Sequence, residues 1–193
     1  MPSFARLAAV STLALAALTS AAPVAERQLA SSLPDILTGL LTQLTPVTGL
    51  LSSVTSDNAT AAVVGPLTSQ VSSILNGAVS QVSNLAGQPT SAILGTADGV
   101  LNATGVANLI QPVMSTTLGA LNDVLAVAND AGVTSVIQPL LNEAGSSLGP
   151  ILTTATPLVN GLLAAAAPVL SPLLSTVNDL GLGDVLNVVE GIL

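Results

Sequence analysis

Few side chains in this 193-residue sequence could carry out catalysis, because it has no His, no Cys and only two basic residues, Arg6 and Arg27. The segment Gly145-Ser-Ser-Leu-Gly149 fits the G-x-S-x-G pattern of hydrolase nucleophile elbows. A serine in that motif needs a histidine to accept its proton, and the chain has none. We therefore interpret the segment as a polar turn and expect no enzymatic activity.

Ten acidic residues are the remaining groups that could perform acid–base or metal chemistry. Two carboxylates can share such work without a histidine, but the site also needs walls that shape it around a substrate. Asp35 follows Ser32 by three residues, which predicts a capping box at a helix start. Asp179 and Asp184 flank a segment with too few oxygen donors for a calcium loop. We expect no catalytic residue, no metal site and no cofactor.

Two segments, Asn58-Ala-Thr60 and Asn102-Ala-Thr104, are N-glycosylation sequons. Each lies in a predicted connection shortly before a helix. In a secreted protein we expect glycans at Asn58 and Asn102, and each glycan would keep its end of the molecule in water.

The N-terminus is typical of a secretory signal. Arg6 supplies the positive charge, Leu7–Leu18 forms an apolar run, and Thr19–Ala22 is a zone of small residues for cleavage. We therefore expect a secreted protein, located outside the cell or in the cell wall. The predicted parts are a signal peptide over 1–21, an N-terminal segment over 22–32 with a second trimming site after Arg27, and a single helical domain over 33–193.

The composition is unusually apolar, with 50% hydrophobic and 6% charged residues and a mean hydropathy of +0.80. Without cysteines, the chain must be stabilised by apolar burial or by an external surface rather than by disulfides. The most apolar part, Pro157–Leu174, contains three prolines and Asn160. An uninterrupted apolar helix of transmembrane length is therefore not expected.

Prolines punctuate the chain, and several follow a residue that suits a helix N-cap, as in Thr45-Pro46. Between them apolar residues recur every three or four positions, and glycines such as Gly132 and Gly145 occupy C-cap positions. The pattern predicts an all-α fold, a multi-helix bundle of short Pro-led amphipathic helices. Strands are the alternative, and the small side chains leave room for a loosely packed core. The expected helices span 33–44, 46–56, 66–86, 89–101, 106–130, 133–144, 149–165, 168–180 and 184–192.

Beyond Arg27 the chain has neither a basic nor an aromatic side chain. This argues against nucleic acid as a partner and against a compact protein-binding epitope. Aliphatic helix faces suit an extended apolar partner, such as an air–water boundary, a waxy solid, a lipid or a second copy of the chain. The residues that we expect at this surface are Leu158, Leu162, Leu163, Val169, Leu170, Leu173, Leu174 and Val177.

In overall plan the sequence resembles two groups of small secreted fungal proteins. The resemblance rests on the signal peptide ending Ala21-Ala22-Pro23, the following Glu26-Arg27 and the cysteine-free body rich in Ser, Thr, Ala, Leu and Val. One group is the basidiomycete hyphal-wall proteins that accompany hydrophobins and support aerial growth and attachment. The other is the helical hydrophobic-surface-binding proteins of moulds, from which this chain departs in its scarcity of Lys and its many prolines. The resemblance assigns no role to any single residue.

The sequence thus favours a non-enzymatic, surface-active structural protein of a fungal cell wall or hyphal surface. Such a protein would contact the wall matrix and adsorb to hydrophobic interfaces through its aliphatic helix faces. The alternative is a helical carrier that holds a lipid or a sterol in an apolar cavity.

Overall fold

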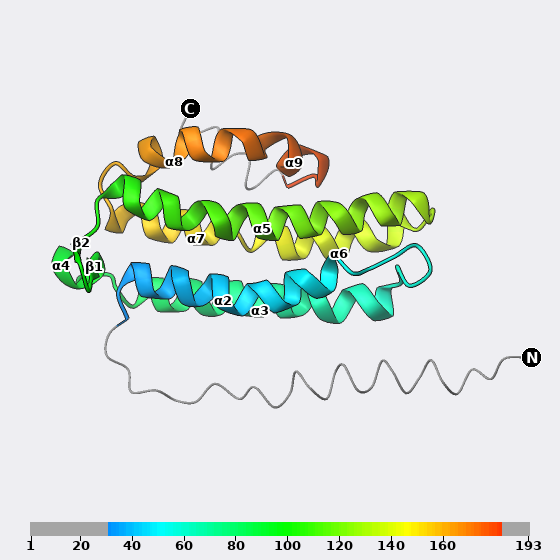
Figure 1. The fold of residues 1–193 in the computed structure, drawn as a ribbon, viewed down its shortest axis with the longest axis horizontal. Coiled ribbons are helices and arrows are strands. Elements are labelled where there is room, and N and C mark those ends of the chain that lie inside the picture. Colours follow the sequence, from blue (N-terminus) through cyan, green and yellow to red (C-terminus); the bar gives the residue numbers. More distant parts are fainter. Residues whose placement is uncertain (1–30, 183–193) are drawn as a thin grey trace, which may run out of the picture.

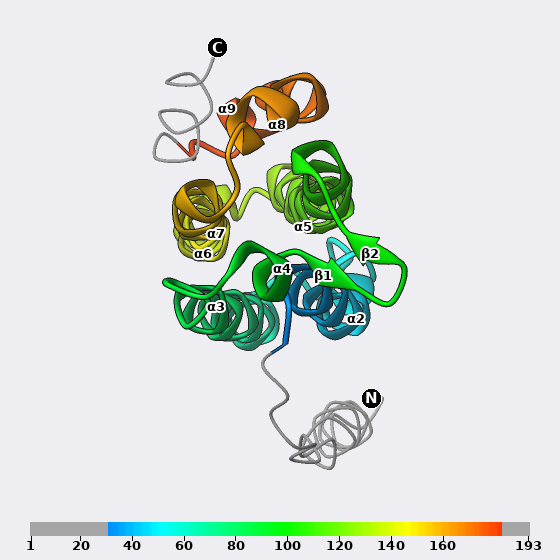
Figure 2. The same ribbon diagram turned by 90° about the vertical axis from the view of Figure 1, so that its left-hand side faces the viewer.

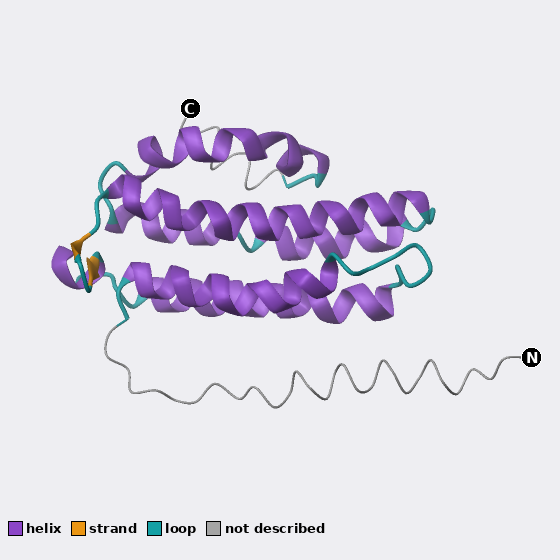
Figure 3. Ribbon diagram, viewed as in Figure 1, coloured by secondary structure: helices purple, strands orange, loops and turns teal. Residues whose placement is uncertain are grey.

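Helices dominate the structure, a computed structural model that describes residues 31–182 (Figure 3). The predicted signal peptide, the cleavage site after Arg27 and the predicted helix 184–192 lie outside the described residues. The prediction of an all-α multi-helix fold is confirmed. The elements are α2 (Leu33–Leu51), α3 (Ala61–Ser83), α4 (Thr90–Ile93), β1 (Gly95–Thr96), β2 (Gly99–Val100), α5 (Ala103–Asp130), α6 (Thr134–Ser146), α7 (Gly149–Ala155), the 3-10 turn η1 (Thr156–Leu158), α8 (Leu162–Leu170), the 3-10 turn η2 (Ser171–Leu173) and α9 (Leu174–Asp179).

The helices stack in three layers (Figures 1 and 2). The first layer is α2 beside α3, the second is α5 beside α6 and α7, and the third is α8 with α9. The central helix is α5, which packs against α2, α6, α8 and α9. The third layer therefore rests mainly on α5.

Local hydrogen bonds fix the helix ends much as the sequence predicts. At the start of α2, Ser32 Oγ accepts from the Asp35 backbone N–H (3.4 Å) and the Ser32 N–H donates to Asp35 Oδ2 (3.2 Å), which is the predicted capping box. At the end of α5, Gly132 has a φ of +70°, and the Val133 N–H donates to the Ala128 carbonyl (2.9 Å). This is a Schellman ending, which a glycine favours because it has no Cβ.

The prediction that prolines mark helix starts is right for Pro34 and Pro150, which lie in first turns, and wrong for Pro46, Pro66 and Pro168. Pro112 and Pro139 lie inside helices, as the predicted ranges 106–130 and 133–144 require. The predicted helices 33–44 and 46–56 are one helix, α2, which ends at Leu51. A proline inside a helix leaves the carbonyl four residues earlier without its partner. Four of these five prolines are exposed and one is half-buried, so water can reach that carbonyl. The prolines inside helices are Pro46, Pro66, Pro112, Pro139 and Pro168.

Two further helix predictions are wrong. The predicted helix 89–101 is the single turn α4 followed by a small hairpin, in which Gly95 pairs with Val100 and Thr96 with Gly99. Gly99 has a φ of +133°, so the turn chemistry of this Gly-rich segment overrides its apolar spacing. The predicted helix 149–165 is split by η1 and by a reversal at Gly161, where φ is +77°.

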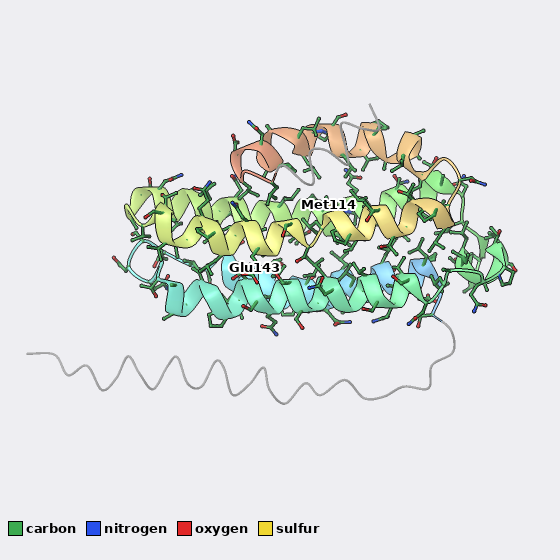
Figure 4. All side chains as sticks on the ribbon, turned by 180° about the vertical axis from the view of Figure 1, so that it is seen from behind. Met114 and Glu143 are labelled. Atoms are coloured by element: carbon green, nitrogen blue, oxygen red, sulfur yellow. The ribbon has the colours of Figure 1, made fainter. Side chains whose placement is uncertain are left out.

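The interior of the described residues is mainly aliphatic and forms one continuous cluster, with Thr48, Thr68 and Thr117 as buried polar residues. The largest fully buried side chains are leucines, isoleucines and Met114 of α5, whereas Glu143 of α6 is exposed (Figure 4). Side-chain hydrogen bonds between different helices are sparse here, an example being Ser52 Oγ to Asp123 Oδ2 (3.2 Å). Aliphatic packing therefore supplies the cohesion between the helices.

Many surface hydroxyls are satisfied within their own helix. Thr42 Oγ1 donates to the Thr38 carbonyl (3.0 Å), and Ser83 Oγ donates to the Val79 carbonyl (2.8 Å). A hydroxyl bonded in this way no longer has its donor free for water or for a partner. These surface hydroxyls consequently offer few free donors.

Replacing either of two helical glycines by alanine should stabilise the protein. A Cβ added at Gly77 of α3 or at Gly119 of α5 would meet no atom within 4 Å. We expect Gly77→Ala and Gly119→Ala each to raise the free energy of unfolding by about 0.5–1 kcal/mol, because alanine has less backbone freedom to lose on folding. Thermal melts followed by far-UV circular dichroism measure this. Gly132→Ala is the control and should lower stability, since φ is +70° there.

Candidate interaction surface

The sequence motif closest to a catalytic site is an ordinary helix end. Gly145 and Ser146 are the last residues of α6, and Ser147 Oγ donates to the Glu143 carbonyl (3.2 Å). Gly145 is not the predicted C-cap but lies inside the helix, buried against Leu182. The described residues contain no histidine, so nothing beside Ser147 could accept its proton.

The acidic side chains are dispersed over the surface. All seven carboxylates within residues 31–182 are exposed. The described residues contain no group of three or more His, Cys, Asp or Glu side chains that could hold a metal ion. In that part of the chain the carboxylates therefore contribute dispersed negative charge.

The two sequon asparagines lie at opposite ends of the bundle, one in the α2–α3 connection and one before α5 (Figure 1). Both side chains are exposed. Asn58 Oδ1 accepts from the Thr55 N–H and Asn102 Oδ1 accepts from the Gly105 N–H, both at 2.8 Å. A glycan is attached to Nδ2, so it would leave both of these hydrogen bonds intact.

A groove of about 360 Å³ lies between α2 and α3 and is open to solvent. Such a volume is within the range of ligand sites, but sites for apolar ligands are mostly closed and apolar. Polar side chains make up much of this lining, which makes the groove a poor fit for a sterol or an acyl chain. The lining residues include Asp35, Gly39, Gln43, Ser73, Gly77 and Gln81.

The third layer is a long apolar segment whose leucines and valines are either buried or half-exposed. We call residues 162–182 the strap, which comprises α8, η2, α9 and the turn that follows. Within Leu162–Asp179 only 22% of the residues are buried, and the segment carries no charged side chain before Asp179. The buried inner row consists of Leu162, Ala166, Leu170 and Val177.

The outer row of the strap points away from the core. Leu163 and Val169 are half-exposed and do not pack against the core cluster. Leu173 and Leu174 are also half-exposed but touch the cluster from outside. Because both rows consist of aliphatic residues, the strap is apolar on the side that faces α5 and also on much of the side that faces solvent.

The strap is anchored at its far end on α6. Leu182 is 3% exposed, and a Cβ added at Gly145 would lie only 2.5 Å from Leu182 Cδ1. Gly181 has a φ of +70°, and the Leu182 N–H donates to the Val177 carbonyl (3.0 Å). The Asn142 amide donates to the Leu180 carbonyl. An apolar residue directly after a C-terminal glycine is the sequence signal for such an ending.

The expected interface residues thus divide into two sets. Leu162, Leu170 and Val177 are at most 2% exposed and contact the bundle rather than solvent. The half-exposed set consists of Leu158, Leu163, Val169, Leu173 and Leu174. Sequence reasoning also missed the most exposed large apolar side chains elsewhere, Val63, Val100 and Val136.

By length and composition alone, one described stretch, Leu162–Asp179, is long and apolar enough to cross a membrane. The expectation that no such helix exists was wrong, because helical turns continue through Pro168 and Pro172. One stretch of this kind is weak support for a membrane span.

No known protein family matches the sequence, and neither the curated proteins nor the solved structures gave a match.

Proposed function

We propose that this chain is a secreted, non-enzymatic, surface-active protein that adsorbs to hydrophobic interfaces through the strap. The observation that carries the proposal is the uncharged, largely apolar stretch from Leu162 to Asn178, in which few residues are buried and several leucines and valines are half-exposed. Contiguous apolar surface of this kind is a feature of interaction sites with membranes, lipids or other apolar partners. The absence of Lys and Arg beyond Arg27 favours a neutral or waxy surface over anionic lipid headgroups.

Three further features fit a cell-wall or hyphal-surface protein. The N-terminal sequence has the form of a secretory signal, the two sequon asparagines are exposed, and the composition resembles that of fungal wall and surface-binding proteins. Glycans at the two ends of the bundle would leave its long sides free, and the strap lies along one of those sides (Figure 1). The proposed partners are an air–water boundary or waxy solid, the wall matrix, and other copies of the chain.

The alternative of a lipid or sterol carrier has less support. The groove between α2 and α3 is open and lined in part by Asp35, Gln43 and Gln81. A carrier would be expected to enclose most of its ligand within apolar walls. If mass spectra showed a lipid that co-purifies with the folded protein, the carrier function would be favoured over the surface-active function.

Removing the outer row should weaken adsorption without unfolding the protein. We expect Leu163→Ser with Val169→Ser to lower the affinity for a hydrophobic colloid about ten-fold, because two half-exposed side chains no longer leave water on binding. The melting temperature should change little, since neither residue packs on the core cluster. Depletion of the supernatant, measured by peptide-bond absorbance, gives the affinity.

The matched control replaces two exposed valines on other helices, Val63→Ser with Val136→Ser. These side chains are 39% and 54% exposed but lie on α3 and α6. Equal loss of adsorption in both double variants would mean that adsorption is nonspecific and that the strap is not the adsorbing surface.

A further inference from the structure

The inner row of the strap is held by a type of contact that an apolar surface could replace. Leu162, Ala166 and Leu170 are spaced four residues apart and face the bundle as a single row. Within α8 the side-chain hydrogen bond of Ser171 goes back to the Ala167 carbonyl (2.8 Å), in its own segment. Moving this row from α5 onto another apolar surface therefore exchanges one aliphatic contact for another, and the helix keeps its backbone hydrogen bonds.

At the end of the strap that follows α7, the backbone can act as a hinge. Gly161 has a φ of +77°, and a Cβ added there would meet no atom within 4 Å. The preceding Asn160 and Gly161 itself are exposed. Glycine tolerates a wide range of backbone angles, so a rotation at this point meets little steric resistance.

The far end is the contact that must open. Leu182 packs directly on Gly145, where any larger residue would collide with its side chain. Gly181 also lies near the ends of the Gln138 and Asn142 side chains of α6, each 3.8 Å from a Cβ added at Gly181. The strap is thus tied to α7 through the chain at one end and to α6 through this contact at the other.

We infer that the strap moves away from α5 when the protein meets an apolar surface. In this motion Leu182 leaves Gly145 and the strap rotates about Gly161. The inner row of the strap and the α5 face beneath it then become part of the adsorbing surface. This inference rests on the proposed function and adds to it the second half of the interface. The partner is an extended neutral apolar surface, which can cover both newly exposed faces at once; a small ligand cannot.

An engineered disulfide tests the inference in a chain that has no cysteine of its own. Leu182 Cγ lies 3.1 Å from the Cβ position of Gly145, which suits a disulfide between Gly145→Cys and Leu182→Cys. When oxidised, this variant has a strap tied at both ends, and we expect it to bind hydrophobic colloid several-fold more weakly than the same variant after reduction. The reduced form is the control for both substitutions.

A second variant should strengthen adsorption instead of weakening it. Gly145→Ala places a Cβ against Leu182 and should loosen the far end, so adsorption should rise several-fold. Gly119→Ala, which meets no neighbouring atom, is the matched control for an added methyl group in a helix. This variant keeps the test decisive if the cysteine pair fails to oxidise.

The outcomes separate the inference from the proposed function. If the oxidised and reduced proteins bind colloid equally, or if Gly145→Ala binds like Gly119→Ala, the strap does not open and the inference is wrong. The proposed function would still stand in that case, provided that Leu163→Ser with Val169→Ser weakens adsorption. If the unmodified protein does not bind colloid at all, the proposed function itself fails.

Discussion

Replacing Leu118 by alanine should lower the free energy of unfolding by about 3–4 kcal/mol, since the change removes buried methyl groups and leaves a cavity. Leu118 is 0% exposed and lies near the middle of α5, the helix that contacts α2, α6 and the strap. A typical domain has a total stability of about 5–15 kcal/mol, so this single change would remove a large part of it. Neither aromatic side chains nor disulfides are present beyond Phe4 to compensate.

Urea or thermal unfolding, followed by far-UV circular dichroism, measures the effect. Leu109→Ala on the same helix is the control, because Leu109 is only half-buried, and we expect it to cost about 1 kcal/mol. If both substitutions lower the free energy of unfolding by the same small amount, and the unfolding transition is broad, the core is loosely packed, as the composition also allows. A much larger loss for Leu118→Ala would establish a well-packed interior.

Acidification should drive the protein into self-association that does not reverse at still lower pH. Acid protonates aspartate and glutamate side chains, so the net charge of residues 31–182 falls from −7 toward zero. Most proteins become positive below this point and dissolve again. This chain has only Arg6 and Arg27 besides its amino terminus, so little positive charge develops and repulsion between molecules is not restored.

Light scattering across a pH series from neutral to about pH 2 measures this association, since the carboxylates lose most of their charge in that range. We expect monodisperse protein above about pH 5 and large assemblies at every lower value tested. Lys substitutions at Asp57 and Asp130, both exposed, should restore solubility in acid. Redissolution of the unmodified chain near pH 2 would contradict this explanation of its solubility.

Local features of the fold could be predicted from the sequence because they depend on neighbouring residues. The capping box of Ser32 and Asp35 and the helix ending at Gly132 are examples. The prolines misled the prediction, because whether Pro46 ends a helix depends on whether its face is exposed, and exposure is a tertiary property. The hairpin at Gly95–Val100 was missed because apolar spacing was weighted above turn chemistry.

The candidate surface could be predicted only as a region. Both rows of the strap consist of aliphatic residues, so hydropathy does not distinguish the inner row from the outer one. Packing on α5 makes that distinction and hides Leu162 while leaving Leu163 half-exposed. The contact between Leu182 and Gly145 joins residues far apart in the sequence, and no periodicity connects them.

The central claim is that the folded protein partitions to an apolar surface. The most direct measurement adds hydrophobic colloid to the mature protein and records both the protein left in solution and the far-UV circular dichroism of the adsorbed fraction. Peptide-bond absorbance is needed, since no aromatic residue follows Phe4. We predict that the supernatant is depleted and that the adsorbed protein keeps its helical content. Protein that stays in solution beside an excess of colloid, and melts there as it does alone, would contradict the claim.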